Sequence, residues 1–285
     1  MNILDLSTYK NYIFIGDPHG IDAIQDILKH FTKDVPDNTI MFFCGDIGLG
    51  FNSIEKESKT LDNCNNIAKK HNYHLILVRG NHDNPNLYVS DSPLNKSNIT
   101  VIEDYTLVNT FDKNVLCIGG AISIDRSRRT EGKSYWKNET VKPIDEFLSI
   151  DIQYADFNID IICAHSSPTY IKPINTSVID QGKIVQDWSI WDSKLKQDNW
   201  NDRHTLNDIY EFISKYHKIS HWIYGHFHDS FYSVKNNTEF IGLDCFRKTK
   251  YFIKRTSNGA FYKQGPDMYD IHDTQKYNNV KFLEF

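Results

Sequence analysis

Two side chains of the kind that bind metal ions follow an apolar run near the start of the sequence. Residues 13–15 are apolar and lead into Gly-Asp-Pro-His-Gly at residues 16–20, which is typical of a buried strand that ends in a tight loop. Asp17 and His19 can point to one place when Gly and Pro brace such a loop. A carboxylate oxygen and an imidazole nitrogen together suit a borderline divalent cation. Taken alone, the stretch would equally fit a turn whose His caps the next helix.

The same pattern recurs along the chain. Four further apolar runs each end in Asp, Asn or His, and the residues at or just beyond their ends are Asp46, Asn81, His82, Asp83, His165, His226 and His228. Ligand crevices form at the carboxyl ends of strands in open α/β sheets, so we expect these side chains to converge. The expected metal ligands are Asp17, His19, Asp46, Asn81, His165, His226 and His228. Seven ligands exceed what one tetrahedral ion uses, and two ions that share a carboxylate would account for the number.

Alternating strands and helices must position these residues. Helical spacing between the first three runs predicts a βαβαβ opening with parallel strands. From residue 98 the runs follow one another without helices, which predicts a second sheet, mixed or antiparallel. The expected helices are 21–31, 53–71, 141–153 and 206–216. The expected strands of the second sheet begin with 99–102, 105–108 and 115–118, and the meander expected to close the fold is 231–234, 239–243 and 251–255.

Two polar stretches interrupt this order. One, at about 121–138, carries a basic cluster and two aromatic residues, and the other, at about 166–203, is anchored by tryptophans. Structureless segments of the second length are uncommon inside compact domains, so we expect it to pack as a cap or rim near the site. We interpret 1–263 as one domain with these insertions and 264–285 as a C-terminal tail.

Composition excludes several classes of protein. The formal net charge of −5 argues against a chain whose main task is to coat nucleic acid or an anionic membrane. The five cysteines are scattered, without a Cys-x-x-Cys pair, so neither a disulfide framework nor a closed, cysteine-rich structural zinc site is indicated. No signal peptide or membrane span is recognisable, and we expect a cytoplasmic protein.

Taken in order, these motifs resemble the calcineurin-like metallophosphoesterase superfamily. The matching elements are Asp-x-His at Asp17, Gly-Asp at Asp46, Gly-Asn-His-Asp at Asn81, a lone His at 165 and Gly-His-x-His at 225–228. The resemblance implies a four-layer α/β/β/α sandwich of two mixed sheets, with a dinuclear metal site at the strand ends. It also implies that Asp17, His19 and His228 hold one ion, that Asn81, His165 and His226 hold the other, and that Asp46 bridges them.

The resemblance further implies a hydrolytic mechanism. A water that bridges both ions would lose a proton and attack phosphorus. His82 would protonate the leaving oxygen, and Asp83 would orient its imidazole. The ligand types accept two divalent ions among Mn, Fe, Zn, Ni, Co and Mg, of which we favour Mn²⁺.

The second motif departs from some branches of the superfamily. Protein phosphatases and bis-nucleoside tetraphosphatases carry Gly-Asp-x-x-Asp-Arg-Gly there, whereas this chain has Gly-Asp-Ile-Gly-Leu-Gly at 45–50. Phosphate contacts must then come from elsewhere, and Arg126, Arg128 and Arg129 are candidates because a guanidinium binds phosphate bidentately. A solvated basic loop is the alternative. Trp136, Trp188 and Trp191 could stack on a base, although packing of the insertions explains them as well.

We therefore expect a dinuclear metal-dependent phosphoesterase that hydrolyses a small-molecule or nucleotide phosphomonoester or phosphodiester. The first alternative is a metal-dependent nuclease acting on DNA or RNA. The second is an inactive metal-binding interaction module, against which the retention of His82, Asp83 and every ligand argues. The remaining histidines lack the glycine-flanked loop context and are expected to be structural or at the surface: His30, His71, His74, His204, His217 and His221. The sequence indicates neither the natural substrate nor an oligomeric state.

Overall fold

The structure is a computed structural model, and it describes residues 1–285 apart from 34, 172–180, 246–251, 256–260 and 265–285. The predicted tail, 264–285, therefore lies outside the described residues except for its first position. The predicted division into one domain with a tail stays a prediction. No helix within the described part of the chain combines the length and apolar character needed to cross a membrane.

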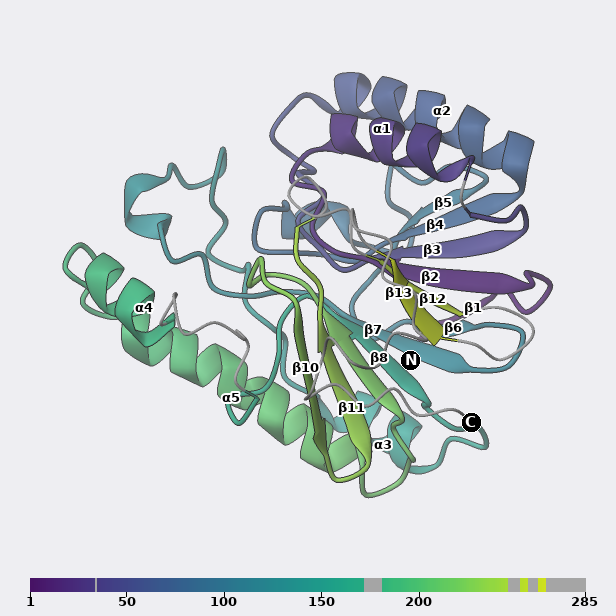
Figure 1. Cartoon of the computed structure of the whole chain (residues 1–285). Coiled ribbons are helices and arrows are strands. Elements are labelled where there is room, and N and C mark those ends of the chain that lie inside the picture. The colour runs from purple at the N-terminus through teal and green to yellow at the C-terminus, as the bar shows by residue number, and fades with distance from the viewer. Residues whose placement is uncertain (34, 172–180, 246–251, 256–260, 265–285) are drawn as a thin grey trace, which may run out of the picture.

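The first sheet lies under two helices (Figure 1). Its order is β13-β12-β2-β3-β4-β5. The parallel strands are β2 (Asn11–Ile15), β3 (Thr39–Phe43), β4 (Tyr73–Leu77) and β5 (Ile99–Val101). The antiparallel edge consists of β12 (Phe252–Arg255), which pairs with β2, and β13 (Phe261–Gln264). The covering helices are α1 (Ile21–Phe31) and α2 (Ile54–His71). They confirm the predicted parallel βαβαβ opening.

The second sheet has the order β1-β6-β7-β8-β9-β11-β10 and mixes parallel and antiparallel pairs. Its strands are β1 (Ile3–Asp5), β6 (Leu107–Asn109), β7 (Asn114–Ile118), β8 (Ile161–Ala164), β9 (His221–Tyr224), β10 (Phe231–Lys235) and β11 (Thr238–Gly242). The helices on this side of the molecule are α3 (Glu146–Gln153), α4 (Gln181–Ser189) and α5 (Leu195–Ile213). Short 3₁₀ turns are η1 (Pro85–Leu87) and η2 (Arg126–Arg128).

Apolar side chains fill the layers between helices and sheets. On β2, Ile13 and Ile15 pack in the cluster that includes α1 and α2, whereas Tyr12 and Phe14 pack between the two sheets with residues such as Cys163 of β8. Both faces of the strand are buried, which explains why its sequence is continuously apolar and not alternating. A third cluster lies between the second sheet and helices α3 and α5. These layers confirm the predicted α/β/β/α sandwich of two mixed sheets.

Some predicted boundaries and pairings were wrong. The strand expected at 99–102 pairs in parallel with β4 in the first sheet, not in the second. The helix expected at 141–153 starts only at Glu146, because Pro143 lies before it and the Asp145 side chain caps it by accepting a hydrogen bond from the Leu148 N–H, at 2.8 Å. The closing strands are not one meander, since β10 and β11 join the second sheet and β12 and β13 the first.

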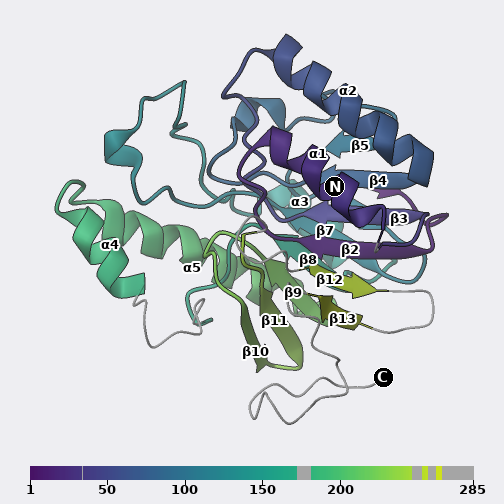
Figure 2. The same cartoon turned by 45° about the horizontal axis from the view of Figure 1, so that its top comes forward.

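The predicted insertions project from the same side of the molecule. The described part of the 166–203 insertion consists largely of α4 and the first half of α5, so the helix expected at 206–216 begins eleven residues earlier, at Leu195, and ends at Ile213. Figures 1 and 2 both place α4 and the excursion that contains η2 on the side where the loops after β2, β3 and β4 emerge. That arrangement agrees with a rim beside the site.

Candidate metal centre and active site

Loops at the carboxyl ends of five strands bring the predicted ligands together. In the first sheet they follow β2 (Asp17, His19), β3 (Asp46) and β4 (Asn81), and in the second they follow β8 (His165) and β9 (His226, His228). Contacts between neighbouring groups connect all seven residues. The site therefore lies where both sheets end, and it needs both sheets to be complete.

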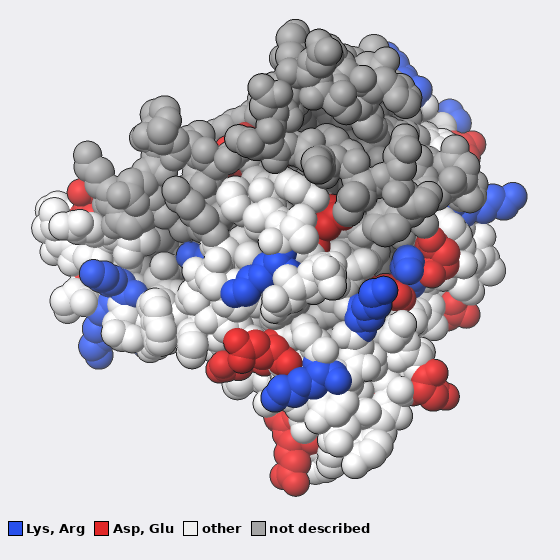
Figure 3. All heavy atoms as spheres, turned by 60° about the horizontal axis from the view of Figure 1, so that its bottom comes forward, with Lys and Arg blue, Asp and Glu red and all other residues white. Residues whose placement is uncertain are grey.

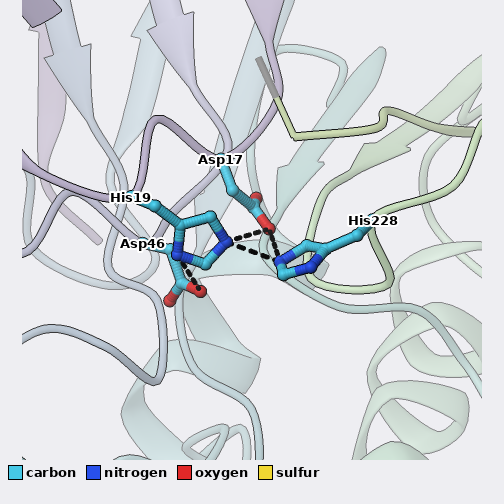
Figure 4. Close-up of side chains that lie close together, drawn as sticks. All are labelled: Asp17, His19, Asp46 and His228. Carbon is cyan, nitrogen blue, oxygen red and sulfur yellow. Dashed lines mark hydrogen bonds and ion pairs between the residues drawn. The ribbon is translucent and has the colours of Figure 1, made fainter. Parts of the chain in front are cut away.

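Four of these residues form a first group, shown in Figure 4. Ligand atoms of Asp17, His19, Asp46 and His228 all lie within 4.8 Å of one another. The Nε2 atoms of His19 and His228 are 2.6 Å apart, and His228 Nε2 is 3.3 Å from Oδ2 of Asp17. The Nδ1 atom of His19 is 3.7 Å from Oδ2 of Asp46. The side chains of His19 and His228 are 25% and 35% exposed, so this group is open to solvent.

The remaining ligands form a second group around the other oxygen of Asp46. His165 Nε2 is 2.9 Å from Oδ1 of Asn81 and 3.2 Å from Oδ1 of Asp46. The ring centroids of His165 and His226 are 5.0 Å apart. Asn81 and His165 are buried. Oδ2 of Asp46 thus faces the first group and Oδ1 the second, which is the arrangement of a bridging carboxylate.

Several ligands have a strained backbone. The φ angles of His19, Asp46, His226 and His228 are 49°, 53°, 67° and 51°, in the left-handed region that residues with a side chain rarely adopt. Each such residue costs on the order of 1 kcal/mol and persists only where the surrounding structure holds it. Strain of this kind concentrates at functional sites, and here it falls on four of the seven predicted ligands.

Glycines in the motifs leave room for the ligands. Gly45 has a φ of +101°, and a Cβ there would overlap the ring of His165. A Cβ at Gly225 would overlap Oδ1 of Asp17. The glycines that precede Asp46 and His226 in the sequence are therefore required by the close approach of one ligand loop to a ligand from the other sheet.

The charges of the site change the protonation of its members. Burial alone would lower the pKa of His165, but the carboxylates of Asp46 and Asp17 and the Cys44 carbonyl raise it to about 10. Burial would raise the pKa of Asp46, but His165 and His82 outweigh it and hold that pKa well below its usual range. Burial lowers the pKa of His19 and of His226. Without metal, the protonated imidazole of His165 therefore balances the negative charge of Asp46 and Asp17. A bound cation would balance the same charge.

The donor set fits divalent cations. Oδ1 of Asp17 is buried and accepts no hydrogen bond within the described part of the chain, although a buried carboxylate oxygen without a partner is costly. The Nδ1 atom of His165 contacts the Cys44 carbonyl at 2.7 Å, which leaves Nε2 free to bind metal. Carboxylate, amide and imidazole ligands together accept the first-row divalent ions and discriminate little among them.

The His82 ring lies beside His19 and Asp46 of the first group, with the His19 and His82 ring centroids 5.6 Å apart, and Asp83 has other partners. His82 Nε2 is 3.9 Å from Oδ2 of Asp46, and Arg129 approaches both ring nitrogens of His82, at 2.8 and 3.3 Å. Asp83 accepts hydrogen bonds from four backbone N–H groups, those of Ile47, Gly48, Leu49 and Gly80, at 2.7 to 3.2 Å. No hydrogen bond of the described residues joins Asp83 to the His82 ring. No described contact therefore supports the prediction that Asp83 orients the His82 imidazole.

The three candidate arginines have different surroundings. Only Arg129 contacts the site, where Asp125 holds its Nε at 2.6 Å while its terminal nitrogens reach His82. Arg126 forms ion pairs with Asp192 and Asp198 of the second insertion.

Arg128 lies over the rings of two of the tryptophans. Its guanidinium carbon is 4.8 Å from the Trp188 centroid and 4.9 Å from that of Trp191. Trp136 is buried against Phe51, with centroids 5.3 Å apart. The Arg128 contacts join the two insertions, Trp136 packs on the loop after β3, and Trp191 remains 62% exposed.

Three residues of the site were missed by the sequence reasoning. Ser123 accepts a hydrogen bond from Nδ2 of Asn81 at 2.9 Å, and Glu139 accepts from Ser123. Arg79 is fully buried and pairs with Asp104 at 3.0 Å. Nothing in the sequence around Ser123 or Glu139 indicates this role. Arg79 did offer a signal, because a charged residue at the end of an apolar strand, directly before a ligand motif, needs a buried partner.

The other histidines whose partners are described contact residues outside the site. His74 contacts the Thr100 hydroxyl, His217 the Ile152 carbonyl and His71 the Asp37 carboxylate, at 2.7 to 2.9 Å. These contacts agree with the structural roles expected for them.

Comparisons with known proteins place the chain in a family. The profile of the calcineurin-like phosphoesterase family matches residues 10–230, about three quarters of the sequence. The chain belongs to this family and is a metal-dependent phosphoesterase, as its motifs predicted. A search of curated proteins found no match.

Solved structures align with this chain at low sequence identity. A dimetal phosphatase from Danio rerio has a TM-score of 0.50 and 11% identity, over 91% of this chain and 96% of that one. A phosphopantetheinyl hydrolase from Mycobacterium tuberculosis has 13% identity over 85% and 92%, with a TM-score of 0.39. A protein serine/threonine phosphatase from Saccharomyces cerevisiae has 14% identity over 93% and 82%, with a TM-score of 0.39. At 11% identity the likeness to the Danio rerio phosphatase concerns the fold alone.

Proposed function

We propose that this chain hydrolyses small-molecule or nucleotide phosphomonoesters or phosphodiesters at a dinuclear centre. Asp17, His19 and His228 would hold one divalent ion, Asn81, His165 and His226 the other, and Asp46 both. The observation that carries the proposal is the position of Asp46, whose Oδ2 is 3.7 Å from a ligand nitrogen of His19 and whose Oδ1 is 3.2 Å from one of His165. Mn²⁺ is the ion that we favour, with Fe, Zn, Ni, Co and Mg as alternatives.

Side chains beside the centre would handle the substrate. Two bound cations would acidify a water shared between them and neutralise charge on the phosphoryl group. We assign proton transfer to the leaving oxygen to His82, which is partly exposed next to Asp46. Arg129 carries a charge at the same place and can donate two parallel hydrogen bonds to a phosphate, replacing the arginine absent from the second motif.

Asp83 would act on the loops and not on the His82 ring. Its carboxylate joins the N–H groups of residues 47–49, after the bridging Asp46, to that of Gly80, before Asn81. A carboxylate that accepts several backbone hydrogen bonds in a buried place fixes the relative position of the segments that donate them. We therefore assign Asp83 to positioning the bridging ligand relative to the loop that carries Asn81 and His82.

The test is a paired assay of an aryl phosphomonoester and an aryl phosphodiester, each with Mn²⁺, Fe²⁺, Zn²⁺, Ni²⁺, Co²⁺ or Mg²⁺. We expect metal-dependent hydrolysis of at least one ester. The His82→Ala variant should keep its metal content and lose roughly a hundredfold or more in kcat, the usual size of a general acid's contribution.

His204→Ala is the matched control, because His204 is 45% exposed and pairs with Asp208 away from the site. Unchanged kcat in His82→Ala would remove that residue from the mechanism, and absence of turnover with every metal would favour the binding module.

The nuclease alternative requires a basic surface. A nuclease needs cationic side chains that follow a phosphate backbone. Among the described residues on the face in Figure 3, Lys and Arg alternate with Asp and Glu and do not form a continuous basic track. Binding of a DNA or RNA oligonucleotide with a steep salt dependence would nevertheless favour the nuclease over the small-molecule enzyme.

A further inference from the structure

A chain of hydrogen bonds runs from the second ligand group into the protein interior. Nδ2 of Asn81 donates to Oγ of Ser123 at 2.9 Å, and Oγ of Ser123 donates to Oε2 of Glu139 at 2.7 Å. The backbone N–H of Ser123 donates to Oε1 of Glu139, also at 2.7 Å. Asn81, Ser123 and Glu139 are 2%, 2% and 1% exposed. Water therefore has little access to compete for these bonds.

The donors and acceptors of this chain have a fixed direction. Above the Glu139 pKa of about 8 the carboxylate is ionised and can only accept, so Glu139 takes the single hydroxyl proton of Ser123. Ser123 Oγ can then only accept from Asn81, which it does from the amide nitrogen. The amide oxygen of Asn81 is consequently turned the other way, to within 2.9 Å of His165 Nε2. Without this constraint, an amide rotated by half a turn would present N–H₂ where a metal requires oxygen.

The far end of the hydrogen-bond chain is anchored to the loop after β4, which carries Asn81. Arg79, two residues before Asn81, donates to the carbonyl of Glu139 at 2.7 Å and to that of Thr140 at 3.0 Å. The same guanidinium pairs with buried Asp104. The Arg79 side chain thus fastens the backbone at Glu139 and Thr140 to the loop that carries Asn81.

We propose that Ser123 and Glu139 are positioning residues that keep the amide oxygen of Asn81 pointed into the second metal position. The proposal rests on the dinuclear function above, with Asn81 as a ligand. It makes metal binding at the second position depend on two side chains that touch no metal. Binding at the first position should be less affected, because the described hydrogen bonds of Ser123 and Glu139 lead to Asn81 of the second group.

The test is a calorimetric titration of the purified metal-free protein with Mn²⁺, carried out anaerobically at pH 8.5. This pH lies above the pKa of Glu139, which burial raises to about 8 against the effect of the Ser123 hydrogen bonds. Ser123→Ala should weaken one of two binding events by ten- to a hundredfold, as is usual when a partner of a metal ligand is removed, and affect the other less. Ser92→Ala is the matched control, because it removes another buried hydroxyl, which accepts a hydrogen bond from the Leu94 N–H away from the site.

Glu139→Gln gives the sharper result. Its amide would donate to Ser123 Oγ, turn the hydroxyl proton towards Asn81 and favour the rotated amide, so we expect an effect at least as large as that of Ser123→Ala. The double variant should then bind Mn²⁺ as Ser123→Ala does, because Glu139 acts only through Ser123. Equal weakening of both events, additive losses in the double variant, or unchanged affinity would each overturn the proposal. Since binding and not turnover is measured, these outcomes stay distinct from a failure of the proposed hydrolysis.

Discussion

The two ligand groups differ in how the protein holds them. His19 and His228 are partly exposed, and their Nε2 atoms lie 2.6 Å apart. Asn81 and His165 are buried. Nδ2 of Asn81 donates to Ser123 Oγ at 2.9 Å, and Nδ1 of His165 lies 2.7 Å from the Cys44 carbonyl oxygen. A prearranged ligand loses little freedom on binding, whereas a mobile one must be ordered. We therefore expect the second position to bind metal more tightly and exchange it more slowly than the first.

The largest effect is expected from the residue that both groups share. Asp46→Asn keeps the shape of the side chain and removes its charge, so metal binding at both positions should weaken. The fall in kcat should exceed about a hundredfold, the largest loss that is usual when a residue supporting a metal ligand is removed. Metal content after dialysis, together with kcat, is the measurement. Loss of only one ion in this variant would show that Asp46 does not bridge.

Ligand variants should separate the two positions. His228→Gln should remove the faster-exchanging ion and leave one tightly held ion per chain, and His165→Gln should weaken the slowly exchanging one. The loss of affinity should exceed about tenfold in each case. The time course of metal release to a chelator distinguishes the His228→Gln variant from the His165→Gln variant. Identical release curves for the two variants would contradict the difference between the groups.

Proton release should also differ between the positions. The pKa of His165 is raised to about 10, so at pH 7.5 the metal-free protein carries a proton there that a metal must displace, whereas burial lowers the pKa of His19. Affinity for the second position should therefore rise by up to about tenfold per pH unit between pH 6.5 and 10, with about one proton released per ion. Titrations in buffers of different ionisation enthalpy measure this number. Equal release at both positions would contradict the assignment.

The smallest effect concerns Arg129, the arginine that contacts the His82 ring. Arg129→Met should raise KM by roughly fivefold, since a charge-assisted hydrogen bond to substrate contributes about 1 kcal/mol or more. Arg128→Met is the matched control, because that guanidinium lies over Trp188 and Trp191. Steady-state kinetics with the preferred aryl ester provide the comparison, and equal KM changes in the two variants would remove Arg129 from substrate binding.

The sequence predicted the elements whose signals are local. Apolar runs that end in Gly-Asp or Gly-His marked the ends of β3 and β9, and helical periodicity marked α1 and α2 closely. Sheet membership depends on long-range pairing, which is why β5 was assigned to the wrong sheet. The start of α3 depended on Pro143, which the periodicity alone did not weigh.

The partners of the ligands could not be predicted in the same way. Ser123 and Glu139 lie 42 and 58 positions after Asn81 in an excursion without regular periodicity, and only folding brings them to it. Asp83 lies next to His82 in sequence, which suggested a direct bond, but its carboxylate turns to the loop after Asp46. Neighbours in a loop often face different ways, so adjacency alone does not assign a partner.

Diffraction from metal-loaded crystals, recorded on both sides of the manganese absorption edge, tests the dinuclear centre most directly. We expect two anomalous peaks about 3.5–4 Å apart, one beside Asp17, His19 and His228 and one beside Asn81, His165 and His226, with Asp46 between them. A single peak, or peaks away from these residues, would contradict the account.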